Sequence, residues 1–471
     1  MRCLWIAVLC ALPGWGQSTL ATLQGTVRDS TDAVVPKATV TVRNVGTNVS
    51  LKFTTNEYGN YEAHNLNPGR YEVTVEAPSF RKFVHSGIAL DARQVVRIDA
   101  RLEVAGAQTE VTVSAGGTPV VTSESAAIDH AIDVRALPLN FRAGSTSLVS
   151  AIALAPGVQI RGSAENFSIA GSRQSQNETS IDGISTLGMR NHDILVNMFP
   201  SAEIVSEMRI SSVNNSAEHQ GSANVDTISR SGENDFHGSV FHHHQNGAFD
   251  AQNFFATRVP LKMANTFGGS LSGPVTLPGL YQGRNRTFFF MDYEGNRVAG
   301  QAVLTPNVPS VALRNGDFTG LTLRDPRSGS PFANNRIPPD RLSRTSLGLQ
   351  EFYPLPNFGP PTLLSGNFRG SFPTRRKSDQ FDLRLDHHTA GRHFLFARLS
   401  FKNLKDGTLN FALPTIGPSR ETPHVRSLAF SHSWTLTPQL VNEFRGGFAR
   451  QWRRIEGPFH GPTIIRPASR R

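Results

Sequence analysis

Apolar and polar residues alternate with a period of two through the C-terminal half of the chain. In the run from 379 to 388, Phe381, Leu383 and Leu385 share one face and charged residues share the other. The run from 392 to 401 alternates in the same way. A strand that separates lipid from water has this pattern, and many such runs without a helical period are typical of a transmembrane β-barrel. The pattern therefore predicts a chain dominated by β-structure.

Shorter alternating runs occupy residues 19–103. Clusters of turn-forming residues at 56–60 and 65–69 separate these runs. Closely spaced short strands with regular turn signals predict a small β-sandwich. Its tyrosines are expected to anchor the core and the turns, because aromatic residues in strands usually pack.

A β-prone run at 108–115 follows the predicted sandwich and precedes a flexible Gly-Gly-Thr-Pro segment. Its central residues are Glu110, Val111, Thr112, Val113 and Ser114. An extended run of this kind can pair with the edge of another protein's sheet through backbone hydrogen bonds. The alternative interpretation is that the run is the last strand of the sandwich, since the two look alike at this length.

Residues 117–232 are rich in Ser, Asn and Gly and contain scattered apolar segments without a strict period. Within them, Asp182-Gly183 is a turn signal, because glycine adopts a positive φ angle without steric cost. We expect these two residues to be mainly structural. Any ligand contacts of this region are expected from its loops.

Residues 1–17 show the ordered features of a secretory signal. Arg2 is followed by an apolar stretch, a Pro-Gly break and small residues, so we expect cleavage near Gly16. A short buried strand is the alternative. Cys10 suggests a lipoprotein, but the bulky Leu9 before it disfavours lipidation.

The two cysteines, Cys3 and Cys10, both lie in this predicted signal. A mature chain without cysteine has no disulfide framework, thiolate nucleophile or cysteine metal site. The formal charge of +10 alone permits nucleic-acid binding, but the basic residues are scattered rather than gathered into a tail or a helix face. We therefore expect no nucleic-acid partner and assign these charges to loops, the barrel lumen and anionic lipid headgroups.

The sequence carries no familiar catalytic motif. It contains no Gly-x-Ser-x-Gly, His-Glu-x-x-His or phosphate-binding Gly-x-x-x-x-Gly-Lys pattern. His242, His243 and His244 are adjacent, but on a strand only two of them share a face, which is too few for a zinc site. The sequence predicts no enzyme, metal site or cofactor, and it favours a polar lumen strand at the histidines.

The sandwich segment resembles a known domain. Residues 25–29, 35–40, 58–61 and 68–71 are similar to the carboxypeptidase regulatory-like, transthyretin-like domain, which has a carbohydrate-binding-like fold. The resemblance implies a transthyretin-like β-sandwich over 19–103. It implies no peptidase activity.

The following segment resembles the plug domain of TonB-dependent receptors, in which a strand and a turn end at Asp-Gly. Residues 169–173 and 179–183 carry this likeness. The resemblance implies a mixed α/β plug over 117–232 and a TonB box at 108–115. It also implies a plug turn motif, made of Gly171, Arg173, Asp182 and Gly183.

An ordered set of motifs after residue 235 resembles the Oar-like TonB-dependent transporters. The set includes Phe236-His237-Gly238, Asn315-Gly316-Asp317-Phe318 and Asn335-Arg336-Ile337-Pro338. The resemblance implies a partial antiparallel barrel over 235–471 in the bacterial outer membrane. It further implies a TonB-ExbB-ExbD-type energy complex as partner, contact with outer-membrane lipid, and import of an unidentified substrate. A surface adhesion or assembly protein that displays the sandwich on a barrel is the alternative function.

Alternation and turn signals indicate roughly eight to ten barrel strands in this region. An eight-stranded barrel encloses only side chains, whereas plugged transporters use about 22 strands. The end of the chain, 466–471, lacks the aromatic-ended strand usual in the family. We therefore expect an incomplete barrel, from a gene fragment, a frameshift product or a split chain.

Overall fold

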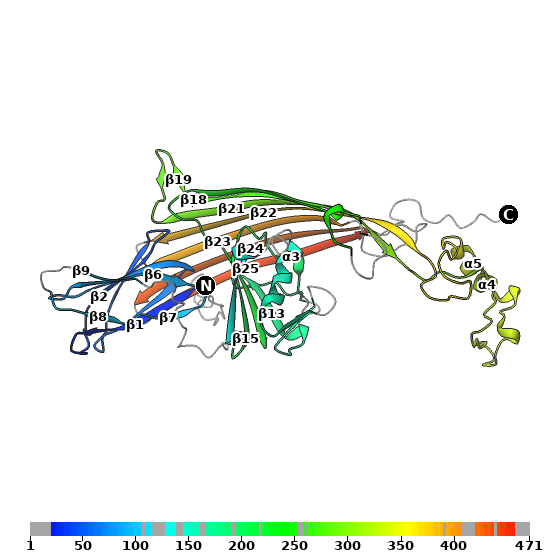
Figure 1. Ribbon diagram of the computed structural model, residues 1–471, viewed down its shortest axis with the longest axis horizontal. Helices are drawn as coiled ribbons and strands as arrows, with labels where there is room; N and C mark the ends of the chain where they lie inside the picture. The colour runs from blue at the N-terminus through cyan, green and yellow to red at the C-terminus, as the bar shows by residue number, and fades with distance from the viewer. Residues whose placement is uncertain are drawn as a thin grey trace, which may run out of the picture.

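The computed structural model describes residues 20–105, 110–114, 128–137, 145–160, 166–189, 194–215, 219, 221–252, 259, 261–389, 392–406, 420–437 and 440–456. The predicted signal at 1–17 lies outside these residues. The described chain has three parts in sequence order: a β-sandwich, a small mixed sheet with short helices, and a large antiparallel sheet (Figure 1). The expected predominance of β-structure is confirmed.

The sandwich packs two sheets face to face. Its strands are β1 (Ala21–Asp29), β2 (Thr39–Asn44), β3 (Ser50–Thr54), β4 (Asn60–Leu66), β5 (Gly69–Glu76), β6 (Lys82–Leu90), β7 (Val95–Arg97), β8 (Ala100–Leu102) and β9 (Glu110–Ser114). One sheet has the order β4-β1-β7, with β8 also paired to β1, and the other has the order β3-β2-β5-β6-β9. Every second residue of a strand points inward, which produces the alternation seen in the sequence.

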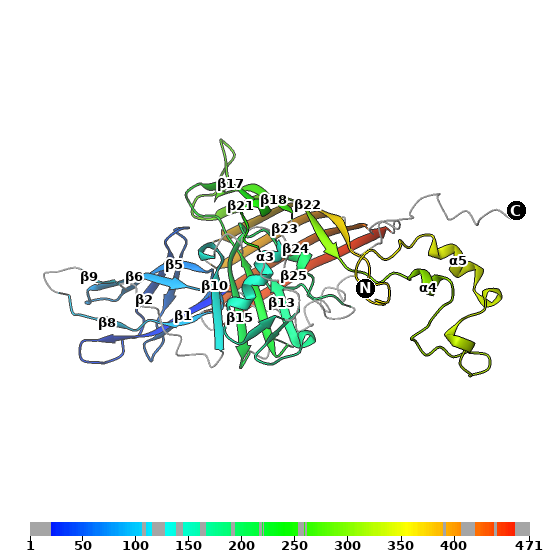
Figure 2. The ribbon, with the colours of Figure 1, turned by 45° about the vertical axis from the view of Figure 1, so that its right-hand side comes forward.

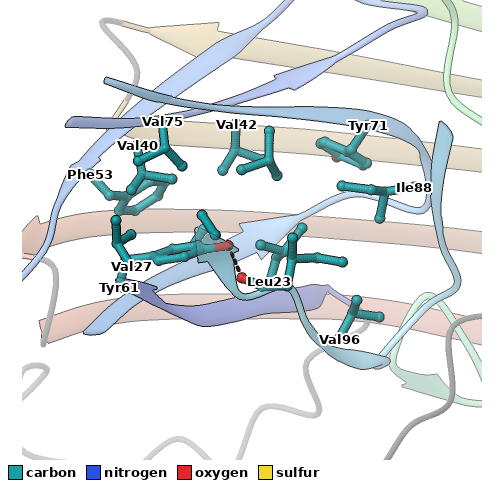
Figure 3. Close-up of a cluster of buried hydrophobic side chains, with 14 of the residues drawn as sticks. Leu23, Val27, Val40, Val42, Phe53, Tyr61, Tyr71, Val75, Ile88 and Val96 are labelled. Carbon is teal, nitrogen blue, oxygen red and sulfur yellow. Dashed lines mark hydrogen bonds between the residues drawn. The ribbon is translucent and has the colours of Figure 1, made fainter. Parts of the chain in front are cut away.

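The core of the sandwich is aliphatic. Figure 3 shows Leu23 and Val27 of β1 facing Val40 and Val42 of β2, with Val75 of β5 beside them. All five side chains are buried. Removal of these side chains from water is the main force that holds the two sheets together.

Two tyrosines anchor this core. The Tyr61 hydroxyl donates to the Ile98 carbonyl at 2.7 Å (Figure 3), and the Tyr71 hydroxyl donates to the Asn67 carbonyl at 2.7 Å. Burial raises the pKa of both hydroxyls, so they remain protonated donors. Tyr58, by contrast, is exposed in its turn. The expected role of tyrosines as core and turn anchors is therefore confirmed for Tyr61 and Tyr71 but not for Tyr58.

The second part combines a five-stranded sheet with short helices. Its elements are β10 (Ile128–Asp133), η1 (Val134–Ala136), α3 (Ser145–Ser150), η2 (Ala151–Leu154), β11 (Val158–Ile160), β12 (Phe167–Ile169), η3 (Gln174–Gln176), β13 (Asn177–Ile181), β14 (Ile184–Ser185), η4 (Val196–Met198), β15 (Val205–Val213) and β16 (Ala223–Ser229). The sheet has the order β10-β15-β16-β13-β14, and β13 is parallel to β16. The mixed α/β architecture implied for the plug is confirmed, and we call this part the plug.

The third part is a seven-stranded sheet in which each strand pairs antiparallel with the next. Its strands are β17 (His237–Asn246), β18 (Lys262–Pro274), β21 (Thr287–Leu304), β22 (Gly370–Thr389), β23 (His393–Asp406), β24 (Arg420–Thr437) and β25 (Leu440–Glu456). Among the described residues, β17 and β25 each pair on one side only (Figure 2). The sheet is therefore open, as expected for an incomplete barrel.

The strand number is below the eight to ten expected, within the part of the chain that the structure describes. The connection from 305 to 369 folds into short helices and turns, and Ser310 and Ser343 cap its two α-helices. The remaining elements are η5 (Gly247–Phe249), β19 (Thr276–Leu277), β20 (Tyr281–Gln282), α4 (Val311–Arg314), η6 (Ala333–Asn335), η7 (Pro339–Arg341) and α5 (Arg344–Gln350).

Side chains of the large sheet alternate between the plug side and the outer side. On β22, Asp382 and Arg384 are buried on the plug side, whereas Phe381 and Leu385 are 39% and 42% exposed on the outer side. The two predicted faces are confirmed. The charged face, however, lies against the plug rather than against open water, because Arg384 donates to the Ser229 carbonyl at 2.8 Å.

The two ends of the large sheet differ. One end carries tight turns and contacts the sandwich: Asn65 Nδ2 donates to Thr435 Oγ1 at 3.4 Å, and Asn234 Nδ2 donates to the Thr47 carbonyl at 2.6 Å. The other end carries the connection from 305 to 369 with α4 and α5 (Figure 1). The sandwich and this long connection therefore lie at opposite ends of the sheet.

Candidate functional site

The predicted Asp-Gly turn joins β13 to β14. Ile181 pairs with Ile184, so Asp182 and Gly183 form a two-residue hairpin loop. Both have positive φ angles, 50° and 77°. This confirms the turn inferred from glycine, and Asp is among the residues that tolerate the left-handed region best.

Asp182 is also the centre of a buried ion cluster, which sequence reasoning missed. Its Oδ2 lies 2.6 Å from Arg398 Nε on β23, and its Oδ1 lies 3.6 Å from Arg384 Nη1 on β22. Ser229, at the end of β16, donates its backbone N–H to Oδ1 at 2.9 Å and its hydroxyl to Oδ2 at 2.8 Å. From β25, Arg445 Nη1 donates to the Asp182 carbonyl at 3.3 Å. We call this group the barrel lock.

The barrel lock has a clear electrostatic cause. Arg384 and Arg398 stand directly opposite each other on neighbouring strands, where like charges repel. Two carboxylates offset this repulsion: Asp182 from the plug, and Asp386, which lies 2.9 Å from Arg384 Nη2. Burial alone would raise the pKa of Asp182, but the two guanidinium groups and the Ser229 hydrogen bonds hold it below its ordinary value. Asp182 is therefore charged.

A second cluster joins the sandwich to the plug. The loop from 91 to 94, between β6 and β7, places the fully buried Ala92 against β15. The Ala92 N–H donates to Glu207 Oε1 at 2.7 Å, and the Ala92 carbonyl accepts a hydrogen bond from Arg209. Arg93 Nη1 lies 2.7 Å from Asp226 Oδ2 on β16. We call this group the sandwich latch.

The sandwich latch is built from strained and buried groups. Arg93 has a φ of 58°, which is uncommon outside glycine and asparagine. Asp226 is buried and also accepts hydrogen bonds from the Ser180 hydroxyl at 2.5 Å and from Asn224 Nδ2 at 2.7 Å. Burial is the main cause that raises the pKa of Glu207 to about 7. Local strain of this kind persists only where surrounding contacts fix it.

One strand carries both clusters. Asp226 of the sandwich latch and Ser229 of the barrel lock are three residues apart on β16. Successive residues of a strand point to opposite faces, so an odd separation places the two side chains on opposite faces of the plug sheet. The plug is therefore held between the sandwich and the barrel wall through β16.

A cavity of about 910 Å³ lies where the sandwich, the plug and the large sheet meet. Glu207 of the sandwich latch and Arg384 of the barrel lock both line it. Other charged residues of its wall are the basic Arg70, Arg135, Arg230 and Arg392 and the acidic Asp91, Asp133, Glu203 and Glu233. The cavity therefore borders one residue of each cluster.

The candidate TonB box forms the edge strand of a sandwich sheet. Residues Glu110 to Ser114 are β9, which pairs parallel with Lys82 to Ser86 of β6. This arrangement corresponds to the interpretation as the last strand of the sandwich. Among the described residues no strand pairs with the other edge of β9, so its backbone groups there are free for strand addition.

The other two residues of the predicted motif lie in a separate turn. Gly171 has a φ of 81° just after β12. The Arg173 N–H donates to Gln176 Oε1 at 3.0 Å at the start of η3. The structure brings neither residue into the hydrogen bonds of Asp182, so the four motif residues form two turns and not one site.

An acidic patch faces the plug from the barrel wall. Asp292 of β21 and Asp382 of β22 stand opposite each other and are both buried, with Glu294 nearby on β21. Both carboxylate oxygens of Asp292 lack a hydrogen-bond partner among the described residues. Lys402 of β23 lies in the neighbouring buried row, with Gln380 and Glu294, and donates to the Phe199 carbonyl of the plug at 3.3 Å. The barrel wall thus presents both signs of charge to the plug.

The histidine run has the alternation expected of a strand. His242 Nε2 and His244 Nδ1 both lie within 3.2 Å of Asn265 Oδ1, and His243 stacks on Phe241 on the other face. Across the described part of the chain, no three His, Cys, Asp or Glu side chains are grouped closely enough to hold a metal ion.

None of the helices in that part is both long and apolar enough to cross a membrane.

Comparison with known proteins agrees with this architecture. Residues 22–103 match the carboxypeptidase regulatory-like domain, and residues 228–463 match the outer membrane beta barrel domain. The TonB-dependent transporter Oar of Myxococcus xanthus is 28% identical over 327 residues, which are 65% of this chain and 29% of Oar. The chain thus spans less than a third of the length of that relative.

Solved structures align less closely. The siderophore receptor PirA of Acinetobacter baumannii aligns over 69% of this chain and 40% of its own, with 14% identity and a TM-score of 0.40. A catechol 1,2-dioxygenase of Acinetobacter sp. ADP1 aligns over 22% of this chain and 60% of its own, with 12% identity and a TM-score of 0.16. Neither likeness carries an argument about activity. Because the barrel domain alone covers half of the sequence, the chain belongs to the outer membrane beta barrel domain family of the bacterial outer membrane, and it is similar to the TonB-dependent transporter Oar.

Proposed function

We propose that this chain is part of a receptor that imports a substrate across the outer membrane with energy delivered from the inner membrane. The likeness to a TonB-dependent transporter supports this proposal. The observation that carries it is the barrel lock, in which one plug carboxylate binds arginines from two barrel strands. A tie made of a few polar groups can break and re-form through a local displacement. A plug that opens and closes requires such a tie.

The proposal includes no chemical step on the substrate. The curated relative is a transporter. Substrate selectivity would depend on the loops, above all on the structured connection from 305 to 369, because binding residues concentrate on loops held by a rigid scaffold. If the chain is instead a surface adhesion or assembly protein that displays the sandwich on a barrel, the plug should not move.

The energy partner would bind at β9. A TonB-type protein pairs with an extended segment through backbone hydrogen bonds, and β9 offers an unpaired edge among the described residues. β9 is mechanically connected to the plug. It pairs with β6, and β6 continues directly into the loop of the sandwich latch. Force applied at β9 would therefore reach the plug through Ala92 and Arg93.

We further propose that the seven described strands are part of a larger closed barrel. Among the residues that the structure describes, the outer edges of β17 and β25 have no partner strand, and each unpaired backbone group costs several kcal/mol in lipid. Additional strands, from the same or another polypeptide, would satisfy them.

A crosslinking experiment tests the partner. A photoreactive residue replaces Thr112, and the chain is irradiated with the periplasmic domain of a TonB protein. Val111→Pro and Val113→Pro each remove a backbone donor and should strongly reduce the crosslink. Val111→Ala and Val113→Ala keep the donors and serve as matched controls. Equal crosslinking by the proline and alanine variants would show that β9 is only a sandwich strand.

A further inference from the structure

The outer face of the large sheet is ordered in rows, because opposite residues of neighbouring strands lie side by side. One row is entirely apolar and runs across five strands: Met291, Leu383, Leu399, Leu428 and Phe448. The next row toward the long connection changes character: Tyr293, Phe381, Phe401, Arg426 and Arg450. Lipid contact thus ends in a line of aromatic and basic residues, which is typical of a membrane interface.

Basic residues accumulate beyond this line. Arg297, Lys377 and Lys405 stand opposite one another on β21, β22 and β23, four residues farther along each strand. Arg454 continues the pattern on β25. We call these four residues, together with Arg426 and Arg450, the basic rim. It spans five consecutive strands on one face.

Few acidic groups neutralise the basic rim. Asp379 binds Arg297 at 2.5 Å, and Glu456 binds Arg454 at 3.0 Å. Lys405 and Arg450 form no ion pair with any acidic side chain that the structure describes. The rim is therefore strongly positive.

Aromatic rings and a side-chain amide orient the central arginines. The Arg426 guanidinium lies 5.4 Å from the centre of the Phe401 ring and 5.3 Å from that of Trp452. Its Nη2 donates to Asn403 Oδ1 at 3.0 Å. Arg450 lies 5.6 Å from the Trp452 ring. Cation–π contacts fix the position of a guanidinium but leave its charge available to an anion.

The opposite end of the same face lacks this feature. The two paired rows nearest the tight turns have no Lys or Arg: Thr287, His387, Leu395, His432 and Phe444, and then Thr389, His393, Trp434 and Asn442. Basic side chains that merely extend toward water would be expected at both ends of a membrane span. The asymmetry therefore points to an anion that is present on one side only.

The location identifies that side. Barrels of the outer membrane have short periplasmic turns and longer extracellular loops, so the connection from 305 to 369 marks the extracellular end. The basic rim thus lies at the level of the outer leaflet, whose main lipid is a glycolipid with phosphates on its sugar headgroup. We propose that the basic rim binds the phosphate groups of this outer-leaflet glycolipid, with Arg426 and Arg450 at the centre of the site.

A planar guanidinium can bind two oxygens of one phosphate at the same time, and the lysines add further positive charge. The aromatic row beneath the rim would contact the sugar headgroup and the start of the acyl chains. Anionic phospholipid of the inner leaflet would meet the other end of the sheet, where these residues are missing.

The test uses the full chain in detergent micelles and native mass spectrometry with purified bisphosphorylated lipid A. Lys405→Gln combined with Arg450→Gln should weaken binding about tenfold, which corresponds to about 1.4 kcal/mol. Arg344→Gln combined with Arg392→Gln removes the same charge at exposed positions outside the rim and should leave binding unchanged. Lys405→Arg combined with Arg450→Lys keeps the charge and should retain binding.

Ligand controls separate the possible sources of phosphate. Dephosphorylated lipid A and phosphatidylglycerol should each bind at least tenfold more weakly than the bisphosphorylated form. Equal affinity for phosphatidylglycerol, or an equal loss in the two glutamine variants, would reduce the rim to unspecific surface charge and overturn the proposal. Displacement of lipid A by inorganic phosphate at comparable concentration would identify a free-phosphate site instead and would also overturn it.

Discussion

The carboxylate of Asp182 lies 2.6 Å from the guanidinium of Arg398, although the two residues are 216 positions apart in the sequence. Both side chains are 1% exposed. A buried ion pair adds little to stability by itself, but removal of one partner leaves an unpaired buried charge. We therefore expect loss of this contact to loosen the plug from the barrel wall.

Asp182→Asn should loosen the plug. Asparagine keeps the left-handed turn but removes the charge that separates Arg384 from Arg398, at a cost of about 3–5 kcal/mol. Limited proteolysis of the plug should accelerate strongly. Asp32→Asn changes an exposed aspartate that also has a positive φ and should have no effect. Equal proteolysis of both variants would show that the barrel lock does not hold the plug in place.

Arg93→Ala should release the sandwich from the plug. The variant leaves Asp226 buried without its cation, so we expect a loss of about 3 kcal/mol or more from the interface. Hydrogen exchange should increase in the 91–94 loop and in β15 and β16. Lys37→Ala replaces another basic residue with a positive φ in the sandwich, but one that is exposed, and it should leave this exchange unchanged.

The sandwich latch should weaken as pH rises. The pKa of Glu207 is about 7 in the folded chain against an ordinary value of 4.5, chiefly because of burial. A raised folded-state pKa favours the protonated form, so its stabilising contribution is complete below about pH 4.5 and is lost as pH rises through about 7. Glu207→Gln keeps the acceptor for the Ala92 N–H and should flatten this dependence in thermal unfolding between about pH 5 and pH 8. A wild-type profile as flat as that of the variant would contradict the assignment.

Asp292→Asn should stabilise the large sheet. Its carboxylate is buried opposite Asp382 and has no hydrogen-bond partner among the described residues, so neutralisation relieves repulsion worth about 1 kcal/mol or more. Urea unfolding in micelles should show a higher midpoint. Asp379→Asn, which breaks an ion pair with Arg297 on the outer face, should lower or preserve the midpoint. A lower midpoint for Asp292→Asn would contradict this prediction.

Local patterns were sufficient to predict most of the architecture. The alternation at 379–388 determined which face of β22 meets lipid, because a period of two leaves a strand only two choices. The Asp-Gly pair determined a hairpin turn through its backbone preference alone. Family resemblance supplied the order of sandwich, plug and barrel, which no local rule contains.

The two ion clusters could not be predicted, because they join segments that are distant in sequence. One signal was available for the barrel lock: when the strands are paired about the turn near residue 390, Arg384 and Arg398 fall opposite each other and require an anion. The sequence does not say which of 37 acidic residues supplies it. Arg93 gave no signal at all, since its loop resembles any polar turn between two strands.

The connection from 305 to 369 contains short helices that the sequence did not predict. Its Asn-Gly and Pro-rich motifs resemble hairpin turns, but short helices use the same residues as caps and stops. Without a partner strand, the sequence alone does not separate these two uses.

The length of β16 has a consequence for how such receptors can diverge. Asp226 and Ser229 face opposite sides because three positions separate them. An insertion or deletion of one residue between them would turn both side chains to the same side, and either the sandwich or the barrel would lose its contact. Relatives that keep both contacts should therefore vary freely in their surface loops, while the interval between Asp226 and Ser229 stays constant in length. A natural insertion or deletion there should be accompanied by loss of Arg93 or of the pair Arg384 and Arg398.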